Sequence, residues 1–231
     1  MGLGPPIARS VARVQQAIAF AASRSGRSSV DVCLLAVSKT RSAEEVAAAA
    51  DAGISHFGEN YVQEALPKVR FLAGRDITWH FIGTVQSNKT RDIARNFQWV
   101  HTLDRNRIAQ RLNSSRAGFA PLDVCIEVNI DDEPQKSGIE PDEIGELIDA
   151  VRGLEHLRLR GLMVIPAPKE DAQSMRDSFS LTAELFDRHR QFGGPHWDTL
   201  SMGMSGDFAV AIEEGATCVR IGTAIFGPRD A

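Results

Sequence analysis

A regular alternation of short apolar segments with longer amphipathic ones constrains the fold of this chain more than any other feature. The apolar segments that we interpret as strands span 32–38, 55–58, 78–82, 98–101, 122–129, 157–164, 197–201 and 216–221. Segments with helical spacing of apolar residues lie at 7–24, 43–52, 60–72, 88–96, 104–117, 141–152, 170–191 and 206–214. Strands that alternate with helices predict parallel βαβ units. Eight such units in 231 residues predict an α/β fold, a (β/α)8 TIM barrel.

An open doubly wound sheet is the rival architecture, but no GxGxxG sequence follows the first predicted strand. The helix over 7–24 precedes that strand and would be an addition to the barrel. A proline in the segment 60–72, Pro67, predicts an interruption or kink there. We find no low-complexity linker, so we expect residues 1–231 to form a single domain.

Lys39 directly follows the first predicted strand, in the sequence LLAVSKT. Partial desolvation of a lysine amine lowers its pKa and frees the nitrogen as a nucleophile. Such lysines form Schiff bases with aldehydes, pyridoxal phosphate among them. An exposed lysine just past a strand end is the alternative, and position alone does not decide between the two.

Two later segments, 200–206 and 220–223, have the composition of a phosphate site. TIM barrels often bind phosphate in the loops that follow strands seven and eight. Glycines there permit a close backbone approach to an anion, Thr223 adds a hydroxyl, and Ser205 is placed to cap the helix over 206–214. A pair of ordinary glycine turns with a helix cap is the alternative.

Arg220 is the second residue that we single out. A guanidinium is always protonated, so one that faces the nitrogen of a pyridine cofactor would keep that nitrogen unprotonated. The ring would then be a weak electron sink. A salt bridge at the barrel rim is the alternative role for Arg220. Other polar residues of the strands, namely His80, Asp123 and Glu127, have ordinary structural interpretations as hydrogen-bonded groups of a polar layer.

Bulk composition excludes several functions. The net charge of −4 offers no basic surface for a nucleic-acid backbone. No segment has the roughly 18 to 20 apolar residues of a membrane span. The six histidines lack metal-ligand spacing, so we expect no metal. Three cysteines without a CxxC pair, and a start without an apolar signal sequence, predict a cytoplasmic protein.

Seven sequence motifs together resemble the pyridoxal phosphate homeostasis protein family. They are AVSKT, HFGENYVQE, WHFIGTVQSNKTR, EVNI…KSG, LRGLM, LSMGMSGDFAVAI and VRIGTAIFG, and they run in the family's order from about residue 34 to 228. The third motif usually contains Pro-Leu where this chain has Thr84 and Val85. That departure concerns the shape of one loop.

The resemblance implies a barrel like the N-terminal domain of alanine racemases, with pyridoxal 5'-phosphate held as a covalent aldimine on Lys39. Arg220 would then face the pyridine nitrogen. The remaining cofactor-binding residues implied by the motifs are Ser205, Gly222 and Thr223 at the phosphate, Met202 in the same loop, and Asn60 and His80 beside the ring.

The resemblance also implies a protein that holds the cofactor and supplies it to apo-enzymes through transient contacts, with no catalytic residues of its own. Weak amino-acid racemisation is the alternative. Racemisation needs an acid or base on each face of the α-carbon. In alanine racemases the second is a tyrosine from a C-terminal domain, for which we expect no room before Ala231. We expect a monomer or a weak dimer.

Overall fold

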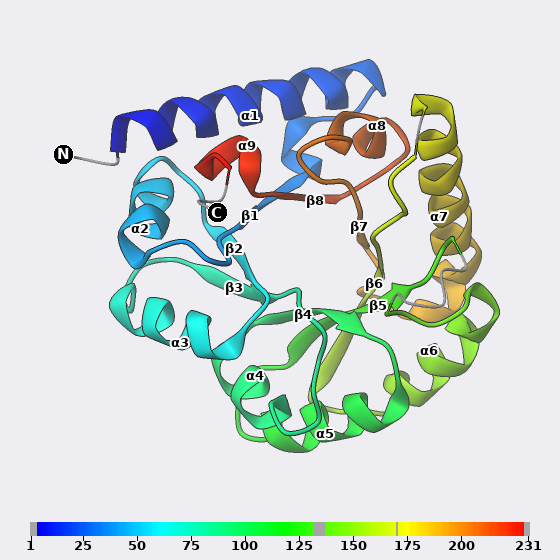
Figure 1. The fold of residues 1–231 in the computed structure, drawn as a ribbon. Coiled ribbons are helices and arrows are strands. Elements are labelled where there is room, and N and C mark those ends of the chain that lie inside the picture. Colours follow the sequence, from blue (N-terminus) through cyan, green and yellow to red (C-terminus); the bar gives the residue numbers. More distant parts are fainter. Residues whose placement is uncertain (1–3, 132–136, 170, 229–231) are drawn as a thin grey trace.

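The computed structural model describes residues 4–131, 137–169 and 171–228. Over these residues, eight parallel strands close into one barrel, in which each strand pairs with the next along the chain and the eighth pairs with the first (Figure 1). The predicted TIM barrel is therefore confirmed. The strands are β1 (Cys33–Val37), β2 (His56–Glu59), β3 (Thr78–Phe81), β4 (Trp99–Leu103), β5 (Leu122–Val128), β6 (Leu157–Val164), β7 (Thr199–Ser201) and β8 (Cys218–Ile221).

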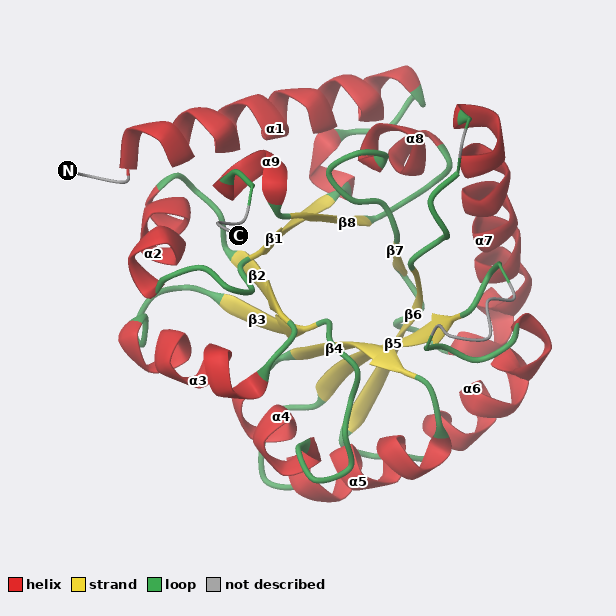
Figure 2. Cartoon of the chain, viewed as in Figure 1, coloured by secondary structure: helices red, strands yellow, loops and turns green. Residues whose placement is uncertain are grey.

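Helices surround the barrel as an outer layer (Figure 2). They are α1 (Gly4–Arg24), α2 (Ala43–Asp51), α3 (Val62–Phe71), α4 (Thr90–Asn96), α5 (Asn106–Arg116), α6 (Ile144–Arg152), α7 (Ala172–Gly193), α8 (Phe208–Glu213) and α9 (Thr223–Phe226), with short 3₁₀ turns η1 (Ser29–Asp31) and η2 (Pro141–Glu143). The additional helix α1 packs along α2, α8 and α9. Among the described residues, no helix combines the length and the apolar character that crossing a membrane requires.

Local sequence signals explain where the helices begin. Ser42 and Glu45 form a capping box at the start of α2, because each side chain accepts a hydrogen bond from the other's backbone N–H. Gly53 follows that helix with φ 96°, a conformation that glycine adopts without steric cost. Helix α3 continues through Pro67, so the predicted interruption is wrong.

The apolar core lies between the strands and the helices, where Phe57, Phe97, Ile93 and Ile126 are fully buried. The inside of the barrel is different. Bulky branched residues usually fill a TIM barrel. Here several polar side chains are buried inside it, from β3, β4, β5, β7 and β8: His80, His101, Glu127, Ser201 and Arg220. The three cysteines are free thiols.

Candidate functional site

A cavity of about 260 Å³ lies at the C-terminal ends of β1 and β8. Its lining comes from the C-terminal ends of β1 and β8 and from the segments that follow β1, β7 and β8: Val37, Lys39, Arg41, Met204, Ser205, Gly206, Arg220, Gly222 and Thr223. The structure therefore brings together five of the predicted residues, namely Lys39, Ser205, Arg220, Gly222 and Thr223. This is the end of the barrel where TIM-barrel enzymes carry their active sites.

The charge of this cavity has one sign. Three cationic side chains line it, Lys39, Arg41 and Arg220, and among the residues that the structure describes no carboxylate does. Arg41 is fixed by the carbonyl oxygens of Gly227 and Pro228, at 2.6 and 2.9 Å from Nη2. A small site with this lining suits a small anion, because cations and hydroxyl donors can both bind its oxygens.

Arg220 is buried in the barrel and is not exposed at the rim, so the salt-bridge alternative does not describe it. Its Nη1 donates to Ser201 Oγ at 2.7 Å and its Nη2 donates to the carbonyl oxygen of Val164 at 2.8 Å. Burial lowers the pKa of the Arg220 guanidinium from its ordinary value. Both hydrogen bonds go to neutral groups, so neither neutralises the positive charge of the guanidinium. That charge can still attract an anion or polarise a hydrogen bond to a ring nitrogen.

Glu127 on β5 is a buried carboxyl whose charge acts on Arg220. No sequence pattern distinguishes it from the other polar strand residues. Burial and the Asp104 carboxylate raise the pKa of Glu127 to about 7, while Arg220 opposes the shift. Its Oε2 is buried and makes no hydrogen bond. Glu127 therefore changes charge near neutral pH, close to the arginine of the cavity.

The loop that carries Lys39 is held by a buried ion pair. Lys68 Nζ lies 2.8 Å from Glu59 Oε1 and donates to the carbonyl oxygen of Ser38 at 2.7 Å. The Ser38 hydroxyl donates to the same carboxylate oxygen at 2.6 Å. Burial raises the pKa of Glu59, although the Lys68 ammonium opposes this. Ser38, the residue before Lys39, is thus bound through its hydroxyl to Glu59 of β2 and through its carbonyl oxygen to Lys68 of α3.

Thr40, which follows Lys39, has φ 66° and is the one non-glycine residue with a positive φ in the described part of the chain. A β-branched residue in this conformation is strained, and strain of this kind clusters at functional sites. The Thr40 amide donates to Glu64 Oε2 at 3.0 Å, which helps to hold the strained turn.

Ser205 has a different local role from the predicted one. Helix α8 begins at Phe208, and its N-terminal cap residue is Asp207, so the prediction that Ser205 caps the helix is wrong. The Ser205 Oγ instead accepts the Ala224 amide at 3.4 Å, which connects the loop after β7 to α9, the helix that follows β8. The two glycine-bearing loops are adjacent, as the sequence predicted.

The two glycines of the β7 loop have different surroundings. A Cβ on Gly203 would lie 2.6 Å from the Ala211 Cβ, and its φ is 92°, so this glycine is required for packing against α8. A Cβ on Gly206 would meet nothing within 4 Å. Gly206 lines the cavity, and no other group covers the place where its side chain would be.

Three predicted residues do not line this cavity. Met202 is fully buried in the apolar core. Asn60 lines a neighbouring cavity of about 230 Å³, together with Tyr61 and Lys89. His80 is buried in the barrel between two other histidines. The roles of Asn60 and His80 beside the cofactor ring, and of Met202 in the phosphate loop, stay predictions.

A larger cavity, about 620 Å³, opens at the opposite end of the barrel, around the start of β1 and β2. Its lining mixes cations and carboxylates, among them Arg27, Asp31, Arg160 and Asp198. The smaller cavity is the better candidate site, because it brings Lys39 and two arginines together at the C-terminal ends of the strands.

Comparison with known proteins identifies the family. Residues 11–230 match the family described as "Alanine racemase, N-terminal domain". A "Pyridoxal phosphate homeostasis protein" of Pseudomonas aeruginosa is 52% identical over 225 residues, which cover 97% of this chain and 96% of that protein. The protein of the same name from Escherichia coli is 51% identical over 235 residues, 97% of each chain. The chain belongs to the pyridoxal phosphate homeostasis protein family.

Solved structures agree with this membership. PipY of Synechococcus elongatus, with pyridoxal phosphate bound, superposes with a TM-score of 0.79 at 34% identity, over 91% of this chain and 100% of that one. Alanine racemase of Corynebacterium glutamicum gives a TM-score of 0.73 at 16% identity, over 96% of this chain and 62% of that one. The second similarity shows that the pyridoxal phosphate homeostasis protein family shares its barrel with the racemases.

Proposed function

We propose that this chain binds pyridoxal 5'-phosphate in the Lys39 cavity, as a Schiff base on Lys39 Nζ, and takes part in the storage and supply of this cofactor. The observation that carries the proposal is the lining of that cavity, which in the described part of the chain consists of one lysine amine and two arginines with polar and small residues and without a carboxylate. The names of the relatives at about 50% identity support the same ligand.

The residues present fit this cofactor on three counts. The phosphate is an anion, and the Ser205 and Thr223 hydroxyls with the bare Gly206 backbone offer donors for it at one end of the cavity. The aldehyde needs an amine, which Lys39 supplies. The pyridine nitrogen needs a polar partner in a buried place, and Arg220 is buried beside the same cavity.

When bound, pyridoxal phosphate supplies an aldehyde for imine formation and an electron-withdrawing ring. Arg220 would donate a hydrogen bond to the ring nitrogen and keep it unprotonated, because a guanidinium has no proton acceptor. Ser201 and the Val164 carbonyl hold the guanidinium in place for this contact. The chain's own residues would therefore bind the cofactor firmly and weaken its use as an electron sink.

The position of the single tyrosine supports a protein that stores the cofactor over one that catalyses racemisation. Tyr61 is 55% exposed and lines the neighbouring cavity with Asn60, away from the Lys39 cavity. Efficient racemisation needs a second acid or base opposite the lysine. No tyrosine lines the Lys39 cavity, so we favour a carrier over a racemase.

We propose further that the chain acts as one barrel domain in the cytoplasm and passes its cofactor to apo-enzymes by transient contact, as a monomer or a weak dimer. Supply can be measured by mixing the loaded protein with a pyridoxal-phosphate-dependent apo-enzyme. Faster activation than an equal concentration of free cofactor gives would support transfer by contact. Activation at the rate set by spontaneous release would oppose it.

The binding proposal is tested by titrating the protein with pyridoxal phosphate and with pyridoxal, which lacks the phosphate, while recording the absorbance of the imine. We expect pyridoxal to bind at least about tenfold more weakly, since it loses charge-assisted hydrogen bonds. Arg41→Ala and Ser205→Ala should weaken binding of the phosphate form alone. Equal affinities for the two aldehydes would contradict a built phosphate site.

A further inference from the structure

A chain of hydrogen bonds crosses the barrel behind Arg220. His56 Nδ1 lies 2.9 Å from His80 Nε2, and His80 Nδ1 lies 2.9 Å from His101 Nε2. His101 Nδ1 lies 2.9 Å from Ser201 Oγ, which accepts the Arg220 guanidinium at 2.7 Å. The chain thus runs without a gap from β2 through β3, β4 and β7 to β8.

The two ends of this chain lie at opposite mouths of the barrel. Arg220 lines the Lys39 cavity at the C-terminal ends of the strands. His56 is half-buried and lines the large cavity at the N-terminal ends, which we call the lower mouth. The three links between them, His80, His101 and Ser201, are buried.

The inner histidines are neutral at ordinary pH. Burial and the Arg220 charge lower the pKa of His101 to about 3. Burial, with His101 and His56 nearby, lowers the pKa of His80 well below its ordinary value. A neutral imidazole has one donor nitrogen and one acceptor nitrogen. Each N···N contact needs one of each, so the tautomer of one ring decides the tautomer of the next.

Only two arrangements of the protons satisfy every link. In the mouthward order, Ser201 donates to His101 Nδ1, His101 Nε2 donates to His80, and His80 Nε2 donates to His56. In the pocketward order, His56 Nδ1 donates to His80, His80 Nδ1 donates to His101, and His101 Nδ1 donates to Ser201. Both orders contain the same number of protons.

Protonation of His56 leaves only one of these two proton orders possible. An imidazolium carries a proton on both nitrogens, so its Nδ1 can only donate to His80 Nε2. The charged form of His56 is therefore compatible with the pocketward order alone. In that order Ser201 Oγ accepts from His101 and from Arg220 together. In the mouthward order its hydroxyl donates to His101, which makes the oxygen a better acceptor for Arg220.

We propose that His56, His80, His101 and Ser201 form one ordered hydrogen-bond chain that positions Arg220 and transmits the proton state of the lower mouth to it. Ser201 and His101 are then positioning residues for Arg220, and His56 is the sensor. The effect on the cofactor rests on the function proposed above, whereas the order of the chain does not.

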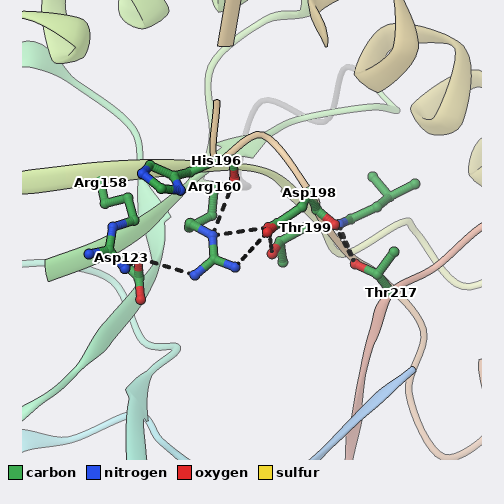
Figure 3. A network of polar contacts seen from close by, with 8 residues as sticks. Asp123, Arg158, Arg160, His196, Asp198, Thr199 and Thr217 are labelled. Atoms are coloured by element: carbon green, nitrogen blue, oxygen red, sulfur yellow. Dashed lines mark hydrogen bonds and ion pairs between the residues drawn. The ribbon is translucent and has the colours of Figure 1, made fainter. Parts of the chain in front are cut away.

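The surroundings of His56 decide when the sensor is charged. Burial lowers the pKa of His56, and the Asp76 carboxylate opposes the shift. Figure 3 shows part of the charged network at the lower mouth, in which Arg160 binds Asp198 through Nη2 at 2.7 Å and lies 3.2 Å from Asp123. The titratable and charged groups that share this mouth with His56 are Arg27, Asp31, Cys33, Arg160 and Asp198.

Nitrogen NMR of histidine-labelled, cofactor-free protein tests the chain directly, because it distinguishes protonated from unprotonated ring nitrogens. At neutral pH we expect His56, His80 and His101 to show the same tautomer. When His56 is charged, His101 must carry its proton on Nδ1. His189 is an internal reference, because it lies outside the hydrogen-bond chain; its Nδ1 is 2.8 Å from the Leu185 carbonyl oxygen.

Opposite tautomers in two of the three rings at neutral pH would overturn the proposal. So would an unprotonated His101 Nδ1 in the presence of charged His56. This measurement uses the unmodified protein, so it does not depend on a variant that folds or on a bound cofactor.

The coupling to Arg220 is tested with two variants that each delete one buried hydroxyl. Ser201→Ala removes a link of the hydrogen-bond chain. The control, Thr182→Val, removes a hydroxyl in α7 that donates to the Ser178 carbonyl. Ser201→Ala should weaken pyridoxal phosphate binding about tenfold, change the absorbance of the bound cofactor, and abolish its dependence on the His56 titration. Thr182→Val should leave all three unchanged. Equal effects of the two variants would overturn the positioning role. Absence of cofactor binding in the unmodified protein would instead refute the proposed function.

Discussion

Lys68 Nζ lies 2.7 Å from the carbonyl oxygen of Ser38, the residue that precedes Lys39. The contact connects helix α3 to the loop after β1, and the Glu59 carboxylate balances the lysine charge. The Schiff base that we propose on Lys39 requires its amine to be held in a fixed position. The buried pair therefore serves the position of Lys39 as well as the stability of the barrel.

We expect Lys68→Ala to lower the free energy of unfolding by about 3 to 5 kcal/mol, since it leaves the buried Glu59 carboxylate without its partner. Urea unfolding measures this loss. The double variant Lys68→Met with Glu59→Gln should recover part of it. Arg75→Ala, which removes an exposed ion pair with Asp51, is the control and should cost less than about 1 kcal/mol. Equal losses for Lys68→Ala and Arg75→Ala would contradict the account.

Thr40→Gly should raise the free energy of unfolding by up to about 1 kcal/mol, because glycine adopts φ 66° without steric cost. The same measurement on Thr84→Gly provides the comparison, since Thr84 is also exposed and has no positive φ. That substitution should cost roughly 0.5 to 1 kcal/mol. A destabilised Thr40→Gly protein would show that the Thr40 side chain contributes more than its strain costs.

Glu127 makes stability depend on pH. Its pKa is about 7 in the folded protein, against an ordinary value of 4.5, so the folded state keeps a proton that the unfolded state loses. The unfolding free energy should therefore fall as pH rises from about 4.5 to about 7, by up to about 3 kcal/mol. Glu127→Gln removes this dependence. A stability difference between the two proteins that stays constant across this window would contradict the raised pKa.

The two glycines of the β7 loop should respond differently to alanine. Gly203→Ala meets Ala211 and a positive φ, so it should cost roughly 1 to 3 kcal/mol of stability. Gly206→Ala meets no atom, so the unfolding free energy should stay within about 0.5 kcal/mol. It should nevertheless weaken pyridoxal phosphate binding, because Gly206 lines the Lys39 cavity and the methyl group would be added at the proposed phosphate site. Unchanged cofactor affinity in Gly206→Ala would show that the phosphate binds elsewhere.

The sequence was sufficient to predict the barrel, since apolar periodicity and strand-helix alternation are local properties. It also predicted the cavity residues that directly follow β1, β7 and β8. It could not predict the role of Lys68, because a buried lysine on a helix looks like any solvent-exposed one in sequence. The link between His56, His80 and His101 depends on the register of three strands, which is fixed only when the barrel closes.

Ser205 illustrates the limit of capping signals. Serine is a favourable cap residue, but Asp207 lies two residues later and α8 starts after it. The choice between them depends on how the β7 loop packs against the loop after β8, which no local pattern encodes.

The most direct test of the central claim is to load the protein with pyridoxal phosphate, reduce it with borohydride and map the labelled lysine by peptide mass spectrometry. The account predicts the label on Lys39, an absorbance band that Lys39→Ala abolishes, and an unchanged band in the Lys89→Ala control. A retained, reducible band in Lys39→Ala, with the label on another lysine, would contradict it.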